Sequence, residues 1–463
     1  MNENPLDLLP ELLLLGGAVL GLLAGIFAGR ERQGVVAWIC GVALAGSAMA
    51  TGFAMKNPEM MAFDAYAVDL PTNVARITVA LGTLLLLPLA RNWARGAKRE
   101  TEVYALLLLA ALGAVLLAGA ADLLVLVAAY LLAGIPSYAL AGFARDAPGT
   151  EAALKYYLMG AFLGVLMLAG VTLILGTAGG TAYDLLDGSV PVAATVMLLA
   201  GLLFKAGGVP GHFWVPDVAE GASRPIAAFV TTVPKIGAFV ALFRLSVLDQ
   251  PLLLAVLAAA TMTLGNLAAF YQDNVRRLLG YSTISQAGYL LVPVAMAGLS
   301  DLAEPALLFY LAAYAVTNIG AFAVVAVTGL DRIADYRGLA GRSPWAAFAL
   351  VVCLLGLVGT PPAAVFVGKV LMFGAAWDGG YAWLAVLAAV NTLASLFYYL
   401  RWIRPVFTAG AGAGTARGGR WGLAVVAAGL SIVLGIASGL LLVIPSWGIN
   451  RGGSDATSHR SGT

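Results

Sequence analysis

Three lysines lie in the middle of long apolar stretches, and they are the residues with the clearest potential for chemistry. Lys205 and Lys235 share the stretch LLFKAGGVPGHFWVPDVAEGASRPIAAFVTTVPKIGAF, and Lys369 lies in a later one. An ammonium group in mid-bilayer costs roughly 2.5–3.5 kcal/mol on insertion scales, so such a lysine usually faces a bundle interior or a wet cavity. Burial favours the neutral amine and a nearby carboxylate favours the charged one. The pattern predicts a proton relay; the alternative is that a side chain snorkels to the membrane surface.

One histidine and two cysteines complete the list of candidate reactive groups within apolar sequence. His212 follows Val209-Pro210-Gly211, and its near-neutral titration makes it a possible proton shuttle or, equally, a hydrogen-bonded interfacial residue. The second histidine, His459, lies in the C-terminal tail, so a histidine metal site is not expected. Cys40 and Cys353 are isolated, which argues against an iron–sulfur or zinc site and predicts small buried side chains.

Other charged and polar residues are expected to have structural roles, in helix caps, ion pairs and water binding, rather than to carry out chemistry. Asp217, Glu220 and Arg224 are expected in a turn, as helix caps and in loop ion pairs. Glu151 and Lys155 have the i, i+4 spacing of a helix-surface pair. Polar residues that could hold bridging waters cluster in the apolar runs of the second half: Asn266, Ser282, Thr283, Ser285, Gln286, Thr317, Asn318, Asn391 and Ser395.

The composition is that of a polytopic membrane protein. Of 463 residues, 61% are hydrophobic and only 11% are charged, against about a quarter charged in soluble domains. The net charge of +2 and the lack of a basic tract give no indication of a nucleic-acid partner. No glycine loop of the phosphate-binding type follows a strand, so ATP and dinucleotide binding are not expected. The N-terminus, MNENPLDLLPELLLL, lacks a basic region and is expected to be a retained first span.

Runs of about 20 apolar residues predict an all-α fold with about fourteen transmembrane helices. They lie near residues 7–29, 34–55, 72–91, 102–120, 123–143, 153–178, 191–213, 226–248, 251–271, 276–298, 303–329, 344–376, 380–406 and 421–445. The seventh contains Gly207-Gly208-Val209-Pro210-Gly211 and the twelfth Thr360-Pro361-Pro362. Because proline removes a backbone donor, both spans should be broken in mid-membrane.

Basic residues predict the orientation of these spans. Eighteen lysines and arginines follow odd-numbered spans, five lie at the opposite surface and three are within the membrane. The positive-inside rule then puts the odd loops in the cytoplasm and both termini outside. A broken span with a lysine occurs twice, five spans apart, which indicates an inverted repeat. Residues 409–419 read as a flexible linker and GGSDATSHRSGT as a disordered tail.

Long motifs spread over nearly the whole chain carry a family resemblance. They are Phe204-Lys205, the run from Val209 to Ala222, Pro234-Lys235, GNLAAFYQDNVRRLLGYSTISQAGYLL at 265–291, Asp335-Tyr336-Arg337-Gly338-Leu339, Gly359-Thr360-Pro361-Pro362 and Gly368-Lys369. Together they resemble the antiporter-like subunits of proton-translocating NADH-quinone oxidoreductase, respiratory complex I, and among these the N subunit.

The resemblance implies a membrane-arm subunit, multi-pass in the bacterial inner (plasma) membrane, that moves protons along a central line of lysines driven by quinone reduction elsewhere. Lys205, Lys235 and Lys369 would be the lysines of spans seven, eight and twelve. NADH, FMN, iron–sulfur clusters and quinone would be bound by partner subunits, and none by this chain. Four regions follow: 1–101 with helices one to three, 102–248 and 249–408 as inverted repeats of helices four to eight and nine to thirteen, and 409–463 with the linker, helix fourteen and the tail.

The chain departs from the family pattern at two positions. Leu131 stands where a glutamate is usual in span five, and Gln286 stands where a histidine is common. Asp122 is nine residues from Leu131, about 13 Å along a helix and on the opposite face, so it cannot replace that carboxylate. We expect any coupling between spans five and seven to run through water and Tyr130, with Lys205 lacking an acidic neighbour.

Two other functions remain open on sequence alone. The departures at Leu131 and Gln286 are compatible with a paralogue that keeps the fold as a non-pumping scaffold of the same complex. Subunits of multisubunit cation/proton antiporters and of membrane-bound hydrogenases share the lysines and form the third alternative.

Overall fold

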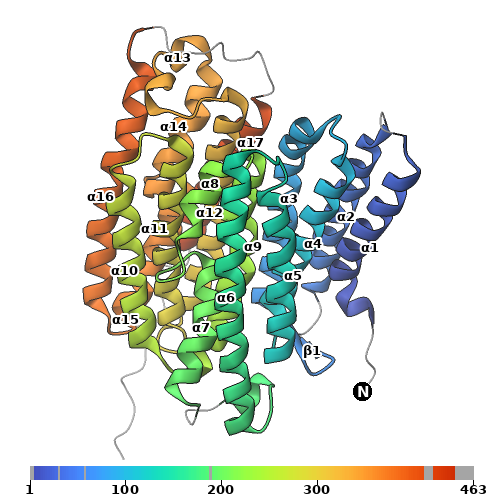
Figure 1. The fold of residues 1–463 in the computed structure, drawn as a ribbon. Coiled ribbons are helices and arrows are strands. Elements are labelled where there is room, and N and C mark those ends of the chain that lie inside the picture. The colour runs from blue at the N-terminus through green and yellow to red at the C-terminus, as the bar shows by residue number, and fades with distance from the viewer. Residues whose placement is uncertain (1–4, 30–31, 57–58, 187–189, 411–420, 444–463) are drawn as a thin grey trace, which may run out of the picture.

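Long apolar runs form the helices that the sequence predicts, and short polar or glycine-containing segments join them (Figure 1). The computed structural model describes residues 5–29, 32–56, 59–186, 190–410 and 421–443. The helices of the first part are α1 Leu9–Phe27, α2 Gly34–Ala54, α3 Leu70–Ala94, α4 Glu100–Gly119, α5 Leu123–Ala141, α6 Ala147–Ala178, α7 Val192–Ala206, α8 Trp214–Gly221 and α9 Arg224–Arg244. Those of the second part are α10 Pro251–Ala269, α11 Val275–Ala295, α12 Ala303–Thr328, α13 Leu339–Arg342, α14 Pro344–Val358, α15 Ala364–Asp378, α16 Ala382–Phe407 and α17 Gly422–Val443.

Short elements complete the described chain. An antiparallel hairpin, β1 Met60–Ala62 and β2 Tyr66–Val68, pairs Met61 with Ala67. Four 3₁₀ turns lie at Pro5–Leu8, Tyr183–Leu185, Leu245–Leu248 and, labelled η5, Ile333–Tyr336. The all-α membrane fold is confirmed. The predicted linker beyond residue 410 and the predicted polar tail lie outside the described residues.

Every predicted span coincides with one helix or with a pair of shorter helices. Eleven of the described helices are long and apolar enough to cross a membrane. The other three predicted spans are α11, the α7–α8 region and the α14–α15 pair; α7 and α14 have only 15 residues each. The number of fourteen crossings therefore stays a prediction.

Both predicted helix breaks are present, and each begins at a glycine. α7 ends at Ala206 because Gly207 adopts a left-handed φ of 76°, and α14 ends at Val358 because Gly359 adopts a φ of 89°. Glycine has no Cβ and takes this conformation without a steric penalty. Residues 214–221 form the helix α8, so the expectation of a turn around Asp217 and Glu220 was wrong.

Two helices, α9 and α12, occupy the centre of the molecule. Nearly every residue of α9 between Pro225 and Leu242 is buried, because α3, α4, α7, α8, α11 and α12 all pack against it. Helices α1 to α4 lie together on one side, and α10, α14, α15 and α16 on the other (Figure 1). Lys235 therefore lies on the most enclosed helix of the bundle.

Ion pairs join the two halves of the chain at one end of the bundle. Asp331 accepts from Arg224 at 2.8 Å and pairs with Arg276 at 3.0 Å. Arg277 pairs with Asp217 at 2.9 Å and with Glu220 at 3.1 Å. Ion pairs are present, but with other partners than expected: Arg224 binds Asp331, and Asp217 and Glu220 bind Arg277 from the helix α8.

The expected helix-surface pair is also present. Lys155 contacts Glu151 at 2.7 Å, and it reaches Asp217 at 3.0 Å.

A buried ion pair fixes α1 against α3. The guanidinium of Arg76, which is fully buried, lies 2.7 Å from one oxygen of Glu11 and 2.9 Å from the other. The hydroxyl of Tyr66 donates to the same carboxylate at 2.7 Å. Because both side chains are buried from solvent, removal of one partner leaves an uncompensated charge.

We expect Arg76→Met to lower the free energy of unfolding by about 3–5 kcal/mol, because it leaves the Glu11 carboxylate buried without its cation. The double variant Glu11→Leu with Arg76→Met should recover most of that loss, since the Tyr66 hydroxyl keeps Val115 O as an acceptor at 3.3 Å. Thermal unfolding in detergent measures both. A double variant as unstable as Arg76→Met alone would contradict this account.

Candidate functional site

The three lysines singled out in the sequence are all buried inside the bundle. Lys205 lies in the last turn of α7, Lys235 near the middle of α9 and Lys369 in the second turn of α15. Their exposed fractions are 0%, 1% and 2%, so none of them reaches the surface as snorkelling would require. They come from three separate helices, and two of these adjoin a helix break.

Lys205 is surrounded by aromatic rings. Its Nζ lies 4.8 Å from the ring centre of Tyr130, 5.2 Å from that of Tyr138 and 5.9 Å from that of Tyr156. Within the described residues this Nζ has no hydrogen-bond partner. Rings at this distance stabilise a protonated amine through their negative faces, by about 2 kcal/mol or more when desolvated. We call Tyr130, Tyr138 and Tyr156 the tyrosine cage.

The cage exists because of a glycine on α5. Tyr130, Gly134 and Tyr138 are spaced four residues apart and so lie on one face of the helix. A Cβ at Gly134 would lie 2.9 Å from Lys205 Nζ and 2.9 Å from the Tyr138 hydroxyl. Residue 134 must therefore lack a Cβ for the Lys205 side chain to fit between the rings.

Leu131, at the position of the usual carboxylate, lies outside the cage. Its side chain is 47% exposed, whereas Tyr130 is buried against Lys205. That coupling between spans five and seven runs through Tyr130 stays a prediction. Asp122 caps α5 through the amides of Leu124 and Val125, in agreement with its expected exclusion from the relay.

Lys235 is held against the first helix break without a charged partner. A Cβ at Gly207 would lie 2.6 Å from its Nζ, so the amine occupies the space that this glycine leaves open. No hydrogen-bond partner of the amine occurs in the described part of the chain. The ring of Trp214 is 5.9 Å from the amine and stacks on Tyr156 at 4.1 Å. Two stacked rings thus separate Lys235 from Lys205.

Lys369 lies against the second break and is hydrogen-bonded. Its amine donates to Val358 O at 2.9 Å and to Thr392 Oγ1 at 3.0 Å, and it lies 4.0 Å above the ring of Tyr289. A Cβ at Gly359 would collide with its methylene chain. Each break glycine is therefore covered by a lysine, Gly207 by Lys235 and Gly359 by Lys369.

Buried hydrogen bonds near Lys235 link α9, α12 and α11. One helical turn before that lysine, Thr231 O accepts from Tyr314 at 3.0 Å. The Tyr314 hydroxyl also lies 3.2 Å from Thr283 Oγ1. Thr283 belongs to α11, the helix that carries Gln286 one turn further on.

A second set of buried hydrogen bonds reaches the carbonyls at the second break. Tyr310 donates to Gln286 at 2.7 Å, and Gln286 donates to Leu357 O at 2.8 Å. Leu357 O is next to Val358 O, which binds Lys369. Gln286 thus lies beside the environment of Lys369, and no hydrogen bond within the described residues links it to Thr283.

The polar residues that the sequence singled out in the second half are all buried, and most of them pair with one another or with tyrosines. Asn266 bonds to Asn391 at 2.9 Å, and Ser282 contacts Tyr399 at 2.5 Å. Asn318 donates to Thr232 at 2.7 Å. The clustering is confirmed for these residues, whereas Ser395 bonds only within its own helix.

Sequence reasoning missed the tyrosines. Tyr138, Tyr156, Tyr289, Tyr310 and Tyr314 are each within reach of a lysine or of the polar chain. The repeat Tyr130–Gly134–Tyr138 was the available signal, because it places two rings and a gap on one helix face. The other tyrosines are indistinguishable in sequence from core aromatics.

His212 lies in the first break and is 7% exposed. Its Nδ1 has no hydrogen-bond partner among the described residues, and its ring packs on Phe213 at 4.4 Å. No hydrogen bond joins it to any of the three lysines within the described chain. Its shuttle role stays a prediction.

The described residues contain no group of three or more His, Cys, Asp or Glu that could hold a metal ion. Cys40 and Cys353 are free and buried, as predicted for small core side chains. Two of the lysine amines have no hydrogen-bond partner among the described residues, the third is bonded, and all three lie near aromatic rings.

Comparisons with known proteins place this geometry in a family. Residues 120–395 match the family described as NADH:quinone oxidoreductase/Mrp antiporter, TM. NADH-quinone oxidoreductase subunit N 1 of Streptomyces griseus is 53% identical, over 96% of this chain and 98% of its own length. Subunit N of a Mycobacterium species is also 53% identical, over 94% and 97%.

Solved structures agree with the sequence relatives. A chain of respiratory complex I from Thermus thermophilus is 35% identical and superposes with a TM-score of 0.84, covering 94% of this chain and 98% of that one. A chain of the Mrp complex from a Dietzia species shares the fold, with a TM-score of 0.82 at 22% identity over 96% of both chains. This chain therefore belongs to the NADH:quinone oxidoreductase/Mrp antiporter family of membrane proteins, among the relatives called NADH-quinone oxidoreductase subunit N.

Proposed function

We propose that protons cross the membrane along Lys205, Lys235 and Lys369 of this chain, which is a membrane-arm subunit of a complex I-type NADH-quinone oxidoreductase. The observation that carries the proposal is the burial of two lysine amines with no hydrogen-bond partner in the described chain. Burial without a partner is costly, and a protein that only needs a stable fold has no use for it. Such groups are the ones that exchange protons readily.

The line of amines provides a stepwise path. Lys205 gains its proton inside the tyrosine cage, where the rings take the place of a carboxylate. Lys235 is the next site, and a proton on it opposes a proton on Lys205, because like charges repel. From Lys235 the path continues past Tyr314, Thr283 and Gln286 to Lys369. Gln286 does not titrate; its amide orients donors and acceptors between the two lysines.

The chain works with partners. Other membrane-arm subunits of complex I are its partners, and the lipid bilayer surrounds it. In this proposal NADH, FMN, iron–sulfur clusters and quinone are bound by other subunits, and quinone reduction there drives the lysines through changes in nearby charge. The chain is thus a translocase component of an oxidoreductase without a redox centre of its own.

Orientation and domain division are part of the proposal. We place both termini outside a bacterial inner membrane, from the excess of basic residues in the odd loops. The N-terminus and α13, which carries Arg342, lie at opposite ends of the bundle, which supports that placement (Figure 1). The regions 102–248 and 249–408 are the two inverted repeats, each with one glycine-initiated break.

A scaffold role is the second candidate, and Leu131 is the observation that favours it. The tyrosine cage weakens this alternative, because it stabilises a proton on Lys205 without a carboxylate. The two candidates differ in what loss of a lysine does to the assembled complex.

We predict that Lys235→Met lowers proton pumping by the assembled complex about tenfold or more, since a positioned proton-transfer group contributes ~10²–10⁴ in rate. The same variant should keep or raise the melting temperature, because it removes an unpaired buried amine. Pumping is measured in proteoliposomes during NADH oxidation. Lys98→Met, at an exposed lysine between α3 and α4, is the matched control and should leave pumping unchanged.

The comparison with Lys369→Met sharpens this test. Loss of Lys369 leaves Val358 O and Thr392 without their donor, so its melting temperature should fall, at a cost of about 1–3 kcal/mol for each unsatisfied group. Normal pumping in an assembled Lys235→Met complex would reject the relay and favour the scaffold.

We further predict that the rings of the cage, rather than their hydroxyls, support Lys205. Tyr138→Phe should keep pumping near its normal rate, because the ring face is retained. Tyr138→Leu should lower it by up to about 30-fold, the loss expected for ~2 kcal/mol of cation–π stabilisation.

The control for the cage is Tyr157→Leu, because Tyr157 is 51% exposed and packs on the outer side of Tyr138. Equal losses in the Phe and Leu variants of Tyr138 would show that the hydroxyl matters and the ring does not. A comparable loss in Tyr157→Leu would point to general repacking of α5 and α6.

A further inference from the structure

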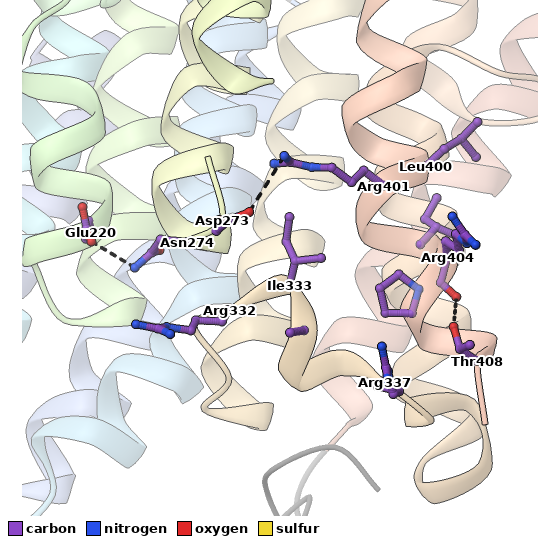
Figure 2. A pocket seen from close by; sticks show the side chains of 13 residues that line it. Glu220, Asp273, Asn274, Arg332, Ile333, Arg337, Leu400, Arg401, Arg404 and Thr408 are labelled. Atoms are coloured by element: carbon purple, nitrogen blue, oxygen red, sulfur yellow. Dashed lines mark hydrogen bonds and ion pairs between the residues drawn. The ribbon is translucent and has the colours of Figure 1, made fainter. Parts of the chain in front are cut away.

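The largest cavity described in the molecule lies away from the lysine line and is lined with arginines. It measures about 1220 Å³, above the roughly 300–1,000 Å³ of small-molecule pockets. Arg332 and Arg337 flank the turn η5, and Arg401 and Arg404 lie in the last turns of α16 (Figure 2). Figure 2 shows the α16 pair and the η5 pair on different sides of the space. We call these four residues the arginine pocket.

Three of the four guanidinium groups are unpaired. Arg332, Arg337 and Arg404 form no side-chain hydrogen bond or ion pair with any described residue, whereas Arg401 donates to Phe270 O at 2.8 Å and also to Gln272 O. Elsewhere near the same end of the bundle Arg224, Arg276 and Arg277 all have carboxylate partners. These paired arginines contrast with the three unpaired ones of the arginine pocket.

The carboxylates at the pocket do not neutralise it. Glu220 already binds Asn274 at 3.0 Å and Arg277 at 3.1 Å. Asp273 is 89% exposed and lies 3.9 Å from Arg401 (Figure 2). The adjoining sequence 411–420, AGAGTARGGR, contains no acidic residue. No carboxylate among the described residues therefore neutralises Arg332, Arg337 or Arg404.

An apolar face continues from the pocket along α16 and α10. Leu400 lines the pocket and is 43% exposed, and below it Phe397 and Leu393 are 66% and 65% exposed. On the adjacent helix Leu267 and Leu264 are 59% and 37% exposed. From Leu400 to Val390, which is 56% exposed, the helix rises about 15 Å, the depth of one leaflet of a ~30 Å hydrocarbon core.

We propose that the arginine pocket binds the phosphate headgroup of an anionic phospholipid whose acyl chains lie along the exposed apolar face of α16 and α10. Guanidinium groups match phosphate oxygens by paired hydrogen bonds. Basic pockets between membrane helices at the cytoplasmic side are suited to anionic headgroups. A soluble phosphate compound would use the same arginines but has no use for the apolar row directly beneath them.

The test measures lipid bound to the whole complex and involves no turnover, so it is independent of the proposed pumping role. Purified complex is delipidated in detergent, supplied with phosphatidylglycerol or phosphatidylcholine, and analysed by native mass spectrometry. The variant Arg332→Gln with Arg404→Gln should bind phosphatidylglycerol at this site about 30-fold more weakly. Arg95→Gln, at an exposed arginine outside any cavity described, is the matched control and should bind normally.

Two further arms separate the sources of the anion and guard against misfolding. Arg332→Lys with Arg404→Lys keeps the charge and should retain most of the lipid, and its melting temperature should match that of the Gln variant. Inorganic phosphate at equal concentration should not displace the lipid. The proposal would be overturned if phosphatidylcholine bound as well as phosphatidylglycerol, or if the Gln variant bound phosphatidylglycerol undiminished. It would also be overturned if inorganic phosphate displaced the lipid, or if the Gln variant lost a neighbouring subunit while it retained the lipid.

Discussion

The cost of burying an ammonium group in a low-dielectric bundle governs the design of this protein. An isolated charge there is unfavourable, so the chain surrounds each amine with groups that can tolerate both of its protonation states. Lys205 has ring faces, Lys235 has the opening left by a glycine, and Lys369 has a carbonyl and a hydroxyl. These three environments differ in the groups that contact the amine.

The two helix breaks supply the space that these environments need. Gly207 and Gly359 end their helices in left-handed conformations and present a bare backbone to Lys235 and Lys369. The carbonyls of Leu357 and Val358, left free by the second break, accept bonds from Gln286 and Lys369. The second helix break therefore supplies two neighbouring carbonyls, one bound by Gln286 and the other by Lys369.

The charges near the ends of the helices follow a different rule from those inside. Several arginines there pair with carboxylates and join the two halves of the chain, as Arg224 and Arg276 do at Asp331. In the arginine pocket, Arg332, Arg337 and Arg404 have no such partner among the described residues (Figure 2). A membrane-spanning protein is surrounded by anionic lipid headgroups. Unpaired arginines above an apolar face can therefore pair with the headgroups of the surrounding bilayer.

The sequence by itself determined the membrane class, the helical spans, both breaks and the burial of the three lysines, because insertion cost and backbone chemistry act within one span at a time. Only the tertiary structure decided which side chains meet. It placed Leu131 outside the tyrosine cage, brought three tyrosines around Lys205, formed α8 where a turn was expected at Asp217, and put Gln286 beside a carbonyl of the second break. These outcomes depend on how each helix is rotated against its neighbours, and that rotation is set by the packing of the whole bundle, which no single span encodes.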